Sequence, residues 1–225
     1  MESKKHIVIY SHGFGVRKDD LGLFTDISES IPEVESILFD YFEVDEGQKT
    51  LTVCPFSVQA EKLNKMVKEA RLSNPEAIID LICHSQGTLV AAMARPEGIR
   101  KALLISAVFD IGLQHSLDRY KTKPGVEINL NGVSKIISAT SGLTRIIPAQ
   151  YWQERVKVKP FEEYNAFANK ADIIAINAKN DQILPKVDLK DLSPKIRVIA
   201  LNGNHNFDGD DRRHLIEIIK KEIYL

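Results

Sequence analysis

Residues 77–92, AIIDLICHSQGTLVAA, decide the fold of this chain. The mostly apolar run 77–82 has the length of one buried strand, and the residues that follow Gly87 can pack as a helix. Between the two, the chain must reverse direction within very few residues. Such a turn strains the backbone of its central residue and leaves the Ser85 hydroxyl exposed above a helix N-terminus. This is the layout of a nucleophile elbow.

The pattern departs from the usual G-x-S-x-G motif at its first position, where Cys83 replaces glycine. A thiol is small, so a tight crossing of strand and helix is still possible. The alternative interpretation is an ordinary strand-to-helix turn with a capping serine. Because S-x-G is common by chance, the other loops of the chain must distinguish these two interpretations.

Size and composition limit the classes of protein to which the chain can belong. Its 225 residues, 44% of them apolar, suit one domain with a sizeable core. A formal charge of −1 argues against a general nucleic-acid binder. No apolar run approaches a membrane span, and the first one, 7–10, is too short for a signal peptide.

The two cysteines are informative because they are so few. Cys54 and Cys83 cannot form a disulfide framework, and their spacing is not that of a metal site. We therefore expect a protein of a reducing compartment, the cytoplasm, without a metal ion.

Apolar runs alternate with amphipathic helical patterns along the chain. Runs of Ile, Leu, Val and Ala without polar alternation are typical of strands buried on both faces, which predicts a mostly parallel sheet of about six strands flanked by helices. Helices are expected from about Asp19 or Asp20, from an N-cap at Ser57 and after Asp208, whereas residues 43–56 are expected to form a loop. The predicted strands are 7–10, 37–39, 77–82, 102–108, 173–178 and 196–201.

Residues 110–165 interrupt this alternation. A structureless loop of that length is uncommon, and Pro148 and Pro160 both fit the first turn of a short helix. We expect a cap inserted over the carboxyl edge of the sheet, where ligands of open α/β folds bind. The predicted organisation is one domain, 1–225, with a cap insertion at about 110–165.

The loops after the last two predicted strands carry a carboxylate and an imidazole. Asp181 follows strand 173–178, and His205 follows strand 196–201. A serine hydroxyl needs a base to take its proton, and the base needs a carboxylate to orient it. The order Ser85, Asp181, His205 is the chain order of one known fold. The alternatives are that Asp181 caps its own turn and that His205 bonds neighbouring amides.

The loop after the first predicted strand, 11–15, provides a further part. Acyl transfer passes through an oxyanion, which preorganised N–H donors stabilise. The backbone N–H groups of Phe14 and Gln86 are the predicted donors. Gly13, directly before Phe14, lets the chain turn sharply in this loop. The helix that begins at Gln86 adds a favourable potential for negative charge.

These residues resemble those of the α/β-hydrolase superfamily. The motif H-G-F at 12–14, with H-S-Q-G at 84–87, is most similar to small intracellular carboxylesterases, including the cinnamoyl or feruloyl esterase type. The resemblance covers roughly residues 5–110 and 171–222 and implies an α/β-hydrolase fold. The chain departs from the family pattern in two ways. Cys83 replaces the first glycine of the elbow motif, and the first predicted strand corresponds to the third strand of the family, so the leading antiparallel strands of the family are not expected.

The resemblance also implies the roles of the site residues. Ser85 is then the nucleophile, His205 the general base and acid, Asp181 its partner, and Phe14 and Gln86 the oxyanion donors. The implied activity is hydrolysis of a carboxylic ester or thioester of a small molecule through an acyl-enzyme, with no cofactor. The alternatives are an amide or acyl-peptide hydrolase with the same triad, and a non-catalytic protein that keeps the fold as a ligand receptor.

Three further residues are candidate substrate contacts. Tyr151 and Trp152 could line an acyl or aromatic pocket, or could simply pack in the core. His12 could contact the substrate, brace the oxyanion loop or be a packed polar residue. His84 adjoins Ser85, but neighbours in a tight turn point apart, so a structural role is expected for it.

Overall fold

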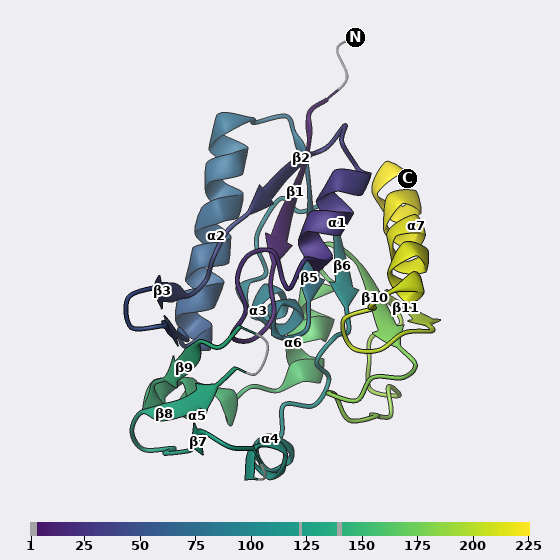
Figure 1. The fold of residues 1–225 in the computed structure, drawn as a ribbon. Helices are drawn as coiled ribbons and strands as arrows, with labels where there is room; N and C mark the ends of the chain where they lie inside the picture. The colour runs from purple at the N-terminus through teal and green to yellow at the C-terminus, as the bar shows by residue number, and fades with distance from the viewer. Residues whose placement is uncertain (1–3, 122, 139–140) are drawn as a thin grey trace.

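The computed structural model describes residues 4–121, 123–138 and 141–225 (Figure 1). Its larger sheet has six strands in the order β11-β10-β6-β5-β1-β2, and all neighbouring strands are parallel. The prediction of a mostly parallel sheet of about six strands is confirmed. Its strands are β1 (His6–Ser11), β2 (Glu35–Leu38), β5 (Ile78–His84), β6 (Lys101–Ile105), β10 (Asp172–Ala178) and β11 (Ile196–Leu201).

Helices cover both faces of this sheet, which explains why its strands lack polar alternation. In β1, Ile7 and Ile9 face one hydrophobic cluster while Val8 and Tyr10 face another, because successive side chains of a strand point to opposite faces. On the second face, α1 (Leu23–Ser30) packs beside α7 (Asp210–Tyr224), as Figure 1 shows. The first face is covered by α2 (Phe56–Ser73), α3 (Gln86–Ala94) and α6 (Pro160–Phe167).

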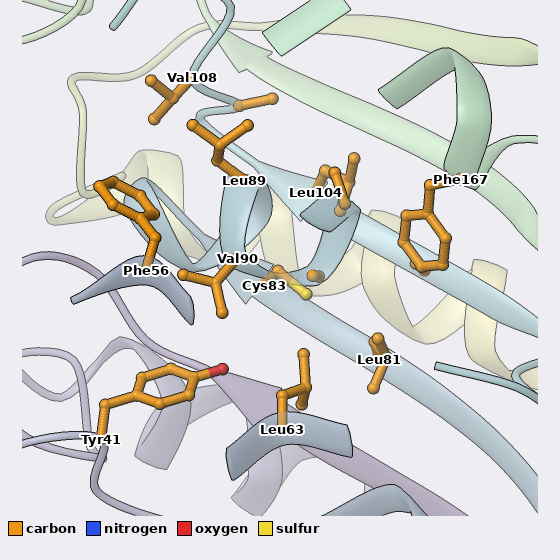
Figure 2. Packing of buried hydrophobic residues seen from close by; sticks show 14 of the residues in the cluster. Tyr41, Phe56, Leu63, Leu81, Cys83, Leu89, Val90, Leu104, Val108 and Phe167 are labelled. Carbon is orange, nitrogen blue, oxygen red and sulfur yellow. The ribbon is translucent and has the colours of Figure 1, made fainter. Parts of the chain in front are cut away.

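Cys83 of β5 lies within the first of these clusters (Figure 2). Its side chain is fully buried near Leu89 and Val90 of α3, and Leu63 of α2 lies across from them. The thiol at the first position of the elbow motif therefore fills core volume and does not reach the surface.

The prediction that residues 43–56 form a loop is wrong. Residues 43–52 contain β3 (Glu43–Asp45) and β4 (Thr50–Thr52), an antiparallel pair in a second sheet. This sheet continues with β9 (Thr144–Ile147), β8 (Ser134–Ile137) and β7 (Val126–Glu127) in the order β3-β4-β9-β8-β7. Strands of three residues carry little periodic signal, and β4 is held by parallel pairing with the distant β9.

Residues 110–165 therefore contain strands as well as helices. They form α4 (Leu113–Lys121), three strands of the second sheet, α5 (Ala149–Arg155) and the first part of α6. Both α5 and α6 begin at the prolines expected to start them, Pro148 as N-cap and Pro160 as the first helical residue. The organisation as one domain, 1–225, with a cap insertion at about 110–165 stays a prediction.

Two helices begin elsewhere than expected. The α1 helix starts only at Leu23 because Asp20, Leu21 and Gly22 have φ values of 47°, 56° and 85°, which no right-handed helix accommodates. The α2 helix starts at Phe56, so Ser57 is not its N-cap. The described ranges contain no helix whose length and apolarity would let it cross a bilayer.

Candidate active site

The candidate site lies at the carboxyl edge of the six-stranded sheet, between β1 and β5. Strand order reverses there, since β2 lies beyond β1 on one side and β6 beyond β5 on the other. Open α/β sheets bind ligands at such a reversal, because the loops after the two strands diverge and leave a crevice. A methyl group on Gly13, in the loop after β1, would stand 3.2 Å from Cβ of Ser85, so the two loops nearly touch.

Ser85 occupies the sharp turn between β5 and α3. Its backbone has φ 50° and ψ −126°, a conformation that non-glycine residues rarely adopt. Its N–H donates to the carbonyl of Ile105 at 3.0 Å, which holds the turn against β6. Two residues on, a Cβ on Gly87 would lie 2.0 Å from the carbonyl oxygen of Ser11, so only glycine allows α3 to approach β1 this closely.

Hydrogen bonds join the Ser85 hydroxyl to an imidazole and a carboxylate. Nε2 of His205 lies 2.9 Å from Oγ of Ser85, and Nδ1 of His205 lies 2.7 Å from Oδ2 of Asp181. The other oxygen of Asp181 accepts the backbone N–H groups of Ile183 at 2.7 Å and Leu184 at 2.9 Å. The structure thus brings together the three side chains that the sequence singled out, from three separate loops.

The surroundings of His205 and Asp181 favour a neutral imidazole beside a charged carboxylate. Burial lowers the pKa of His205, and the charge of the nearby His84 acts in the same direction, against the raising effect of Asp181. Burial by itself would raise the pKa of Asp181, but the hydrogen bond and charge of His205, with two backbone N–H groups, outweigh it and lower the pKa. A neutral imidazole is the form that can accept a proton from serine.

Two backbone N–H groups next to Ser85 are free. Within the described part of the chain, the N–H groups of Phe14 and Gln86 donate to no other group. The neighbouring N–H of Gly13 is occupied, since it donates to Oδ2 of Asp20 at 2.8 Å. Gly13 is therefore not available as a donor, whereas the N–H of Phe14 is.

Solved structures with the same arrangement of strands and helices are numerous. One is Est1E from Butyrivibrio proteoclasticus with bound ferulic acid, with a TM-score of 0.71, 14% identity, and coverage of 98% of this chain and 89% of that one. Another belongs to the metagenome-derived lipolytic enzymes LipS and LipT, with a TM-score of 0.69, 12% identity, and coverage of 98% and 94%. This chain adopts the α/β-hydrolase fold.

A third structural neighbour is DcsB in complex with its substrate analogue, with a TM-score of 0.69, 16% identity, and coverage of 99% of this chain and 91% of that one. At these identities the likeness establishes the fold. No protein-family model and no curated protein sequence matches the chain. The expected α/β-hydrolase fold is confirmed, including its resemblance to feruloyl esterases at the level of structure.

A second histidine–carboxylate pair lies beneath the turn at Ser85. Nδ1 of His84 is 2.9 Å from Oδ2 of Asp20, and Nε2 of His84 is 3.1 Å from the carbonyl oxygen of His205. Both ring nitrogens face acceptors, so both carry hydrogen, as in an imidazolium ion. Burial disfavours this charge, but Asp20 outweighs burial and raises the pKa of His84, while His84 lowers that of Asp20.

This pair connects the two loops that flank Ser85. Asp20 accepts the N–H of Gly13 in the loop after β1, and His84 hydrogen-bonds the carbonyl oxygen of His205 in the loop after β11. A structural role for His84 was expected from the sequence, but its partner was not. Asp20 follows no strand and stands in no motif, so only its position in the fold reveals it.

His12 lies beneath the site and lines neither cavity beside Ser85. His12 is 1% exposed, Nδ1 donates to the carbonyl of Gly13 at 3.0 Å, and Nε2 accepts the N–H of Tyr41 at 3.0 Å. Burial lowers the pKa of the ring, in keeping with this neutral form. Both ring nitrogens of His12 bind backbone groups, so His12 stabilises the loop after β1.

Tyr151 and Trp152 are also buried and do not line the two cavities beside Ser85, a placement that fits the packing alternative for these residues. Tyr151 is 0% exposed and donates from its hydroxyl to Oε1 of Gln86 at 2.7 Å, and burial raises its pKa to about 12. Trp152 is 2% exposed and donates to Oγ of Ser134 at 3.0 Å. Aromatic residues of α5 turn inward because they join the second sheet to α2 and α3, and Tyr151 thereby fixes the Gln86 side chain.

Two cavities flank Ser85. The smaller, of about 70 Å³, is bounded by Phe14, Gln86, α4 and residues 183–185. The larger, of about 220 Å³, is bounded by His205 in the loop after β11 and by several positively charged side chains. In the described ranges no cluster of three or more His, Cys, Asp or Glu side chains is arranged to hold a metal ion.

Proposed function

We propose that this chain is a serine hydrolase that cleaves carboxylic esters or thioesters, with Ser85 as nucleophile, His205 as general base and acid, and Asp181 as its orienting carboxylate. The observation that carries the proposal is the continuous line of hydrogen bonds from Ser85 Oγ through His205 to Asp181, at 2.9 and 2.7 Å. The named esterases and lipolytic enzymes among the structural neighbours support it.

In the proposed reaction, Oγ of Ser85 attacks the acyl carbon while its proton moves to Nε2 of His205. The carbonyl oxygen becomes an oxyanion that the N–H groups of Phe14 and Gln86 bind, at the N-terminus of α3. When the intermediate collapses, His205 returns the proton to the leaving oxygen or sulfur, and the acyl group stays on Ser85. His205 then deprotonates water, which releases the acid and restores the hydroxyl. These steps require no metal ion or organic cofactor.

The pH dependence of the reaction follows from the low pKa of His205. The neutral imidazole is the active form, so kcat/KM should fall as the pH drops through a pKa below the usual 6.5 of histidine and reach its plateau above that pKa. Asp181 stays ionised over this range because its own pKa is lowered. The measurement is kcat/KM for a neutral aryl ester across acid and neutral pH. An inflection above 7 would contradict the assignment of His205.

Labelling with a fluorophosphonate tests the proposed function most directly. The wild-type protein should gain one adduct, and mass spectrometry of its peptides should place that adduct on Ser85 because an activated serine attacks phosphorus as it attacks an acyl carbon. His205→Ala should label far more slowly, while His214→Ala, which alters an exposed histidine on α7, should label like the wild type.

An adduct on another residue, or none in folded wild-type protein, would overturn the proposal. The second outcome would instead favour a non-catalytic receptor.

Matched esters and amides, such as phenyl acetate and acetanilide, separate ester from amide hydrolysis. A cytoplasmic location stays a prediction from the sequence. In the structure, the thiols of Cys54 and Cys83 are free.

A further inference from the structure

Positively charged side chains surround the cleft of the proposed hydrolase. Arg119, Lys123 and Arg145 line the larger cavity beside Ser85, and Arg119 also lines the smaller one together with Arg155. None of these four side chains forms an ion pair within the described ranges.

The acidic residues that line the two cavities do not balance this charge. Asp20 lines the larger cavity, but it is paired with the buried His84. Asp110 lines the smaller cavity, but it is exposed and accepts the backbone N–H of Gly112 at 2.6 Å. The larger cavity therefore has an excess of positive charge beside the nucleophile.

Arg145 is held firmly in its position. Its Nε donates to the carbonyl of Gly15 at 2.9 Å, its Nη2 donates to Oγ of Ser138 at 3.2 Å, and its guanidinium carbon lies 5.7 Å from the centre of the Phe14 ring. A side chain at Gly15 would have its Cβ 2.2 Å from Nε of Arg145, so glycine makes room for the guanidinium. Burial lowers the pKa of Arg145, and no carboxylate compensates for it.

Arg119 has an unused donor. Its Nε is buried and has no hydrogen-bond partner in the described structure, and Nη2 reaches only the hydroxyl of Tyr120, at 3.3 Å. Native proteins rarely leave a buried donor unsatisfied, because it has lost its hydrogen bond to water without gaining another. The guanidinium end of Arg119 also has N–H groups that donate to nothing in the described structure, and these can bind an acceptor of a substrate in the cavity that Arg119 lines.

The chemistry of the reaction indicates which part of the substrate these groups meet. His205 must give its proton to the leaving atom, so the leaving group lies in the larger cavity, which His205 lines. The acyl group then enters the smaller cavity of about 70 Å³, which favours a short chain. On that side, three of the five N–H donors of Arg155 already bind protein groups, namely Ile111, Ser116 and Tyr151. The carboxylate of Asp110 also lines this cavity, so the smaller cavity is less suited to an anion than the larger one.

We propose that the substrate is a short-chain acyl ester or thioester whose leaving alcohol or thiol carries an anionic group, a carboxylate or phosphate, bound by Arg119 and Arg145. Guanidinium groups bind both anions through charge-assisted, often bidentate hydrogen bonds. This inference rests on the proposed function, since it specifies the substrate of the same site.

The test compares substrates that differ only in charge. The first pair is 3-acetoxybenzoate and 3-acetoxybenzamide, which release an anionic and a neutral phenol. The wild type should prefer the anionic ester by about tenfold or more in kcat/KM, mainly through KM, as expected for charge-assisted hydrogen bonds. Added salt should reduce the preference. A further substrate, 3-acetoxyphenyl phosphate, distinguishes phosphate from carboxylate as the preferred anion.

Variants then assign the preference to the two arginines. Arg119→Gln and Arg145→Gln should each lower the ratio of kcat/KM between the anionic and the neutral ester by about tenfold. The matched control is Arg213→Gln, which changes an exposed arginine on α7 whose partner is Asp210 and should leave the ratio as in the wild type. Monophenyl succinate and phenyl succinamate place the charge on the acyl side, where no comparable preference is expected.

The outcomes separate this inference from the proposed function. A wild-type ratio near one, or a ratio that neither variant changes, overturns the anionic leaving group while ester hydrolysis stands. Preference for the succinate on the acyl side overturns it as well. Failure to hydrolyse either acetoxy ester, by protein that a fluorophosphonate labels on Ser85, overturns the substrate class alone. Hydrolysis that survives intact in Ser85→Ala overturns the proposed function itself.

Discussion

Ser85→Ala should lower kcat/KM for a neutral aryl ester by about 10⁵- to 10⁶-fold, the loss seen when a triad nucleophile is removed. The methyl group cannot form an acyl intermediate, so only the oxyanion donors and substrate binding would still accelerate attack by water. Steady-state hydrolysis of phenyl acetate provides the measurement, with enough enzyme to quantify the residual rate.

Two controls make this result specific. Ser73→Ala, at the exposed end of α2, should retain wild-type activity. The double variant Ser85→Ala, His205→Ala should be little slower than Ser85→Ala alone, because residues that act as one unit have strongly non-additive effects. Activity of Ser85→Ala within tenfold of the wild type, in protein with an unchanged circular dichroism spectrum, would mean that another group is the nucleophile.

Gly87→Ala should destabilise the fold by about 3 kcal/mol or more, a large fraction of the 5–15 kcal/mol typical of a domain. The added methyl would lie 2.0 Å from the carbonyl oxygen of Ser11 and 2.7 Å from that of His12. These are backbone atoms at the end of a central strand, so relief requires α3 to move away from β1. The free energy of unfolding in urea measures the effect.

Gly142→Ala is the matched control for the glycine substitution. Among the described residues, none lies within 4 Å of its added methyl, so the left-handed backbone, with φ 68°, is the expected cost, at about 1–2 kcal/mol. The difference between the two variants therefore measures the close approach of α3 to β1. Equal losses of stability would show that the helix can shift without cost.

Much of the site could be predicted because each catalytic candidate directly follows a strand. Parallel strands place their carboxyl ends at one edge of a sheet, so residues as distant as 85, 181 and 205 are expected to meet there. The structure has hydrogen bonds between them at 2.9 and 2.7 Å. The sequence pattern predicted the positions of packed residues less well. His12, Tyr151 and Trp152 lie near the site, but they are buried beneath it and hydrogen-bond other protein groups.

The six-stranded parallel sheet and the elbow follow from local pattern, because runs of apolar residues buried on both faces, and a serine between strand and helix, carry their signal within a few neighbours. The β3–β4 pair, the Asp20–His84 pair and the arginines around the cleft carry no such signal. Each acquires its role from partners far away in the chain: β4 pairs with β9, Asp20 meets His84, and Arg145 packs on Gly15. Hydrogen bonds and charges act over a few ångströms in space, so only the folded chain decides which of these groups meet.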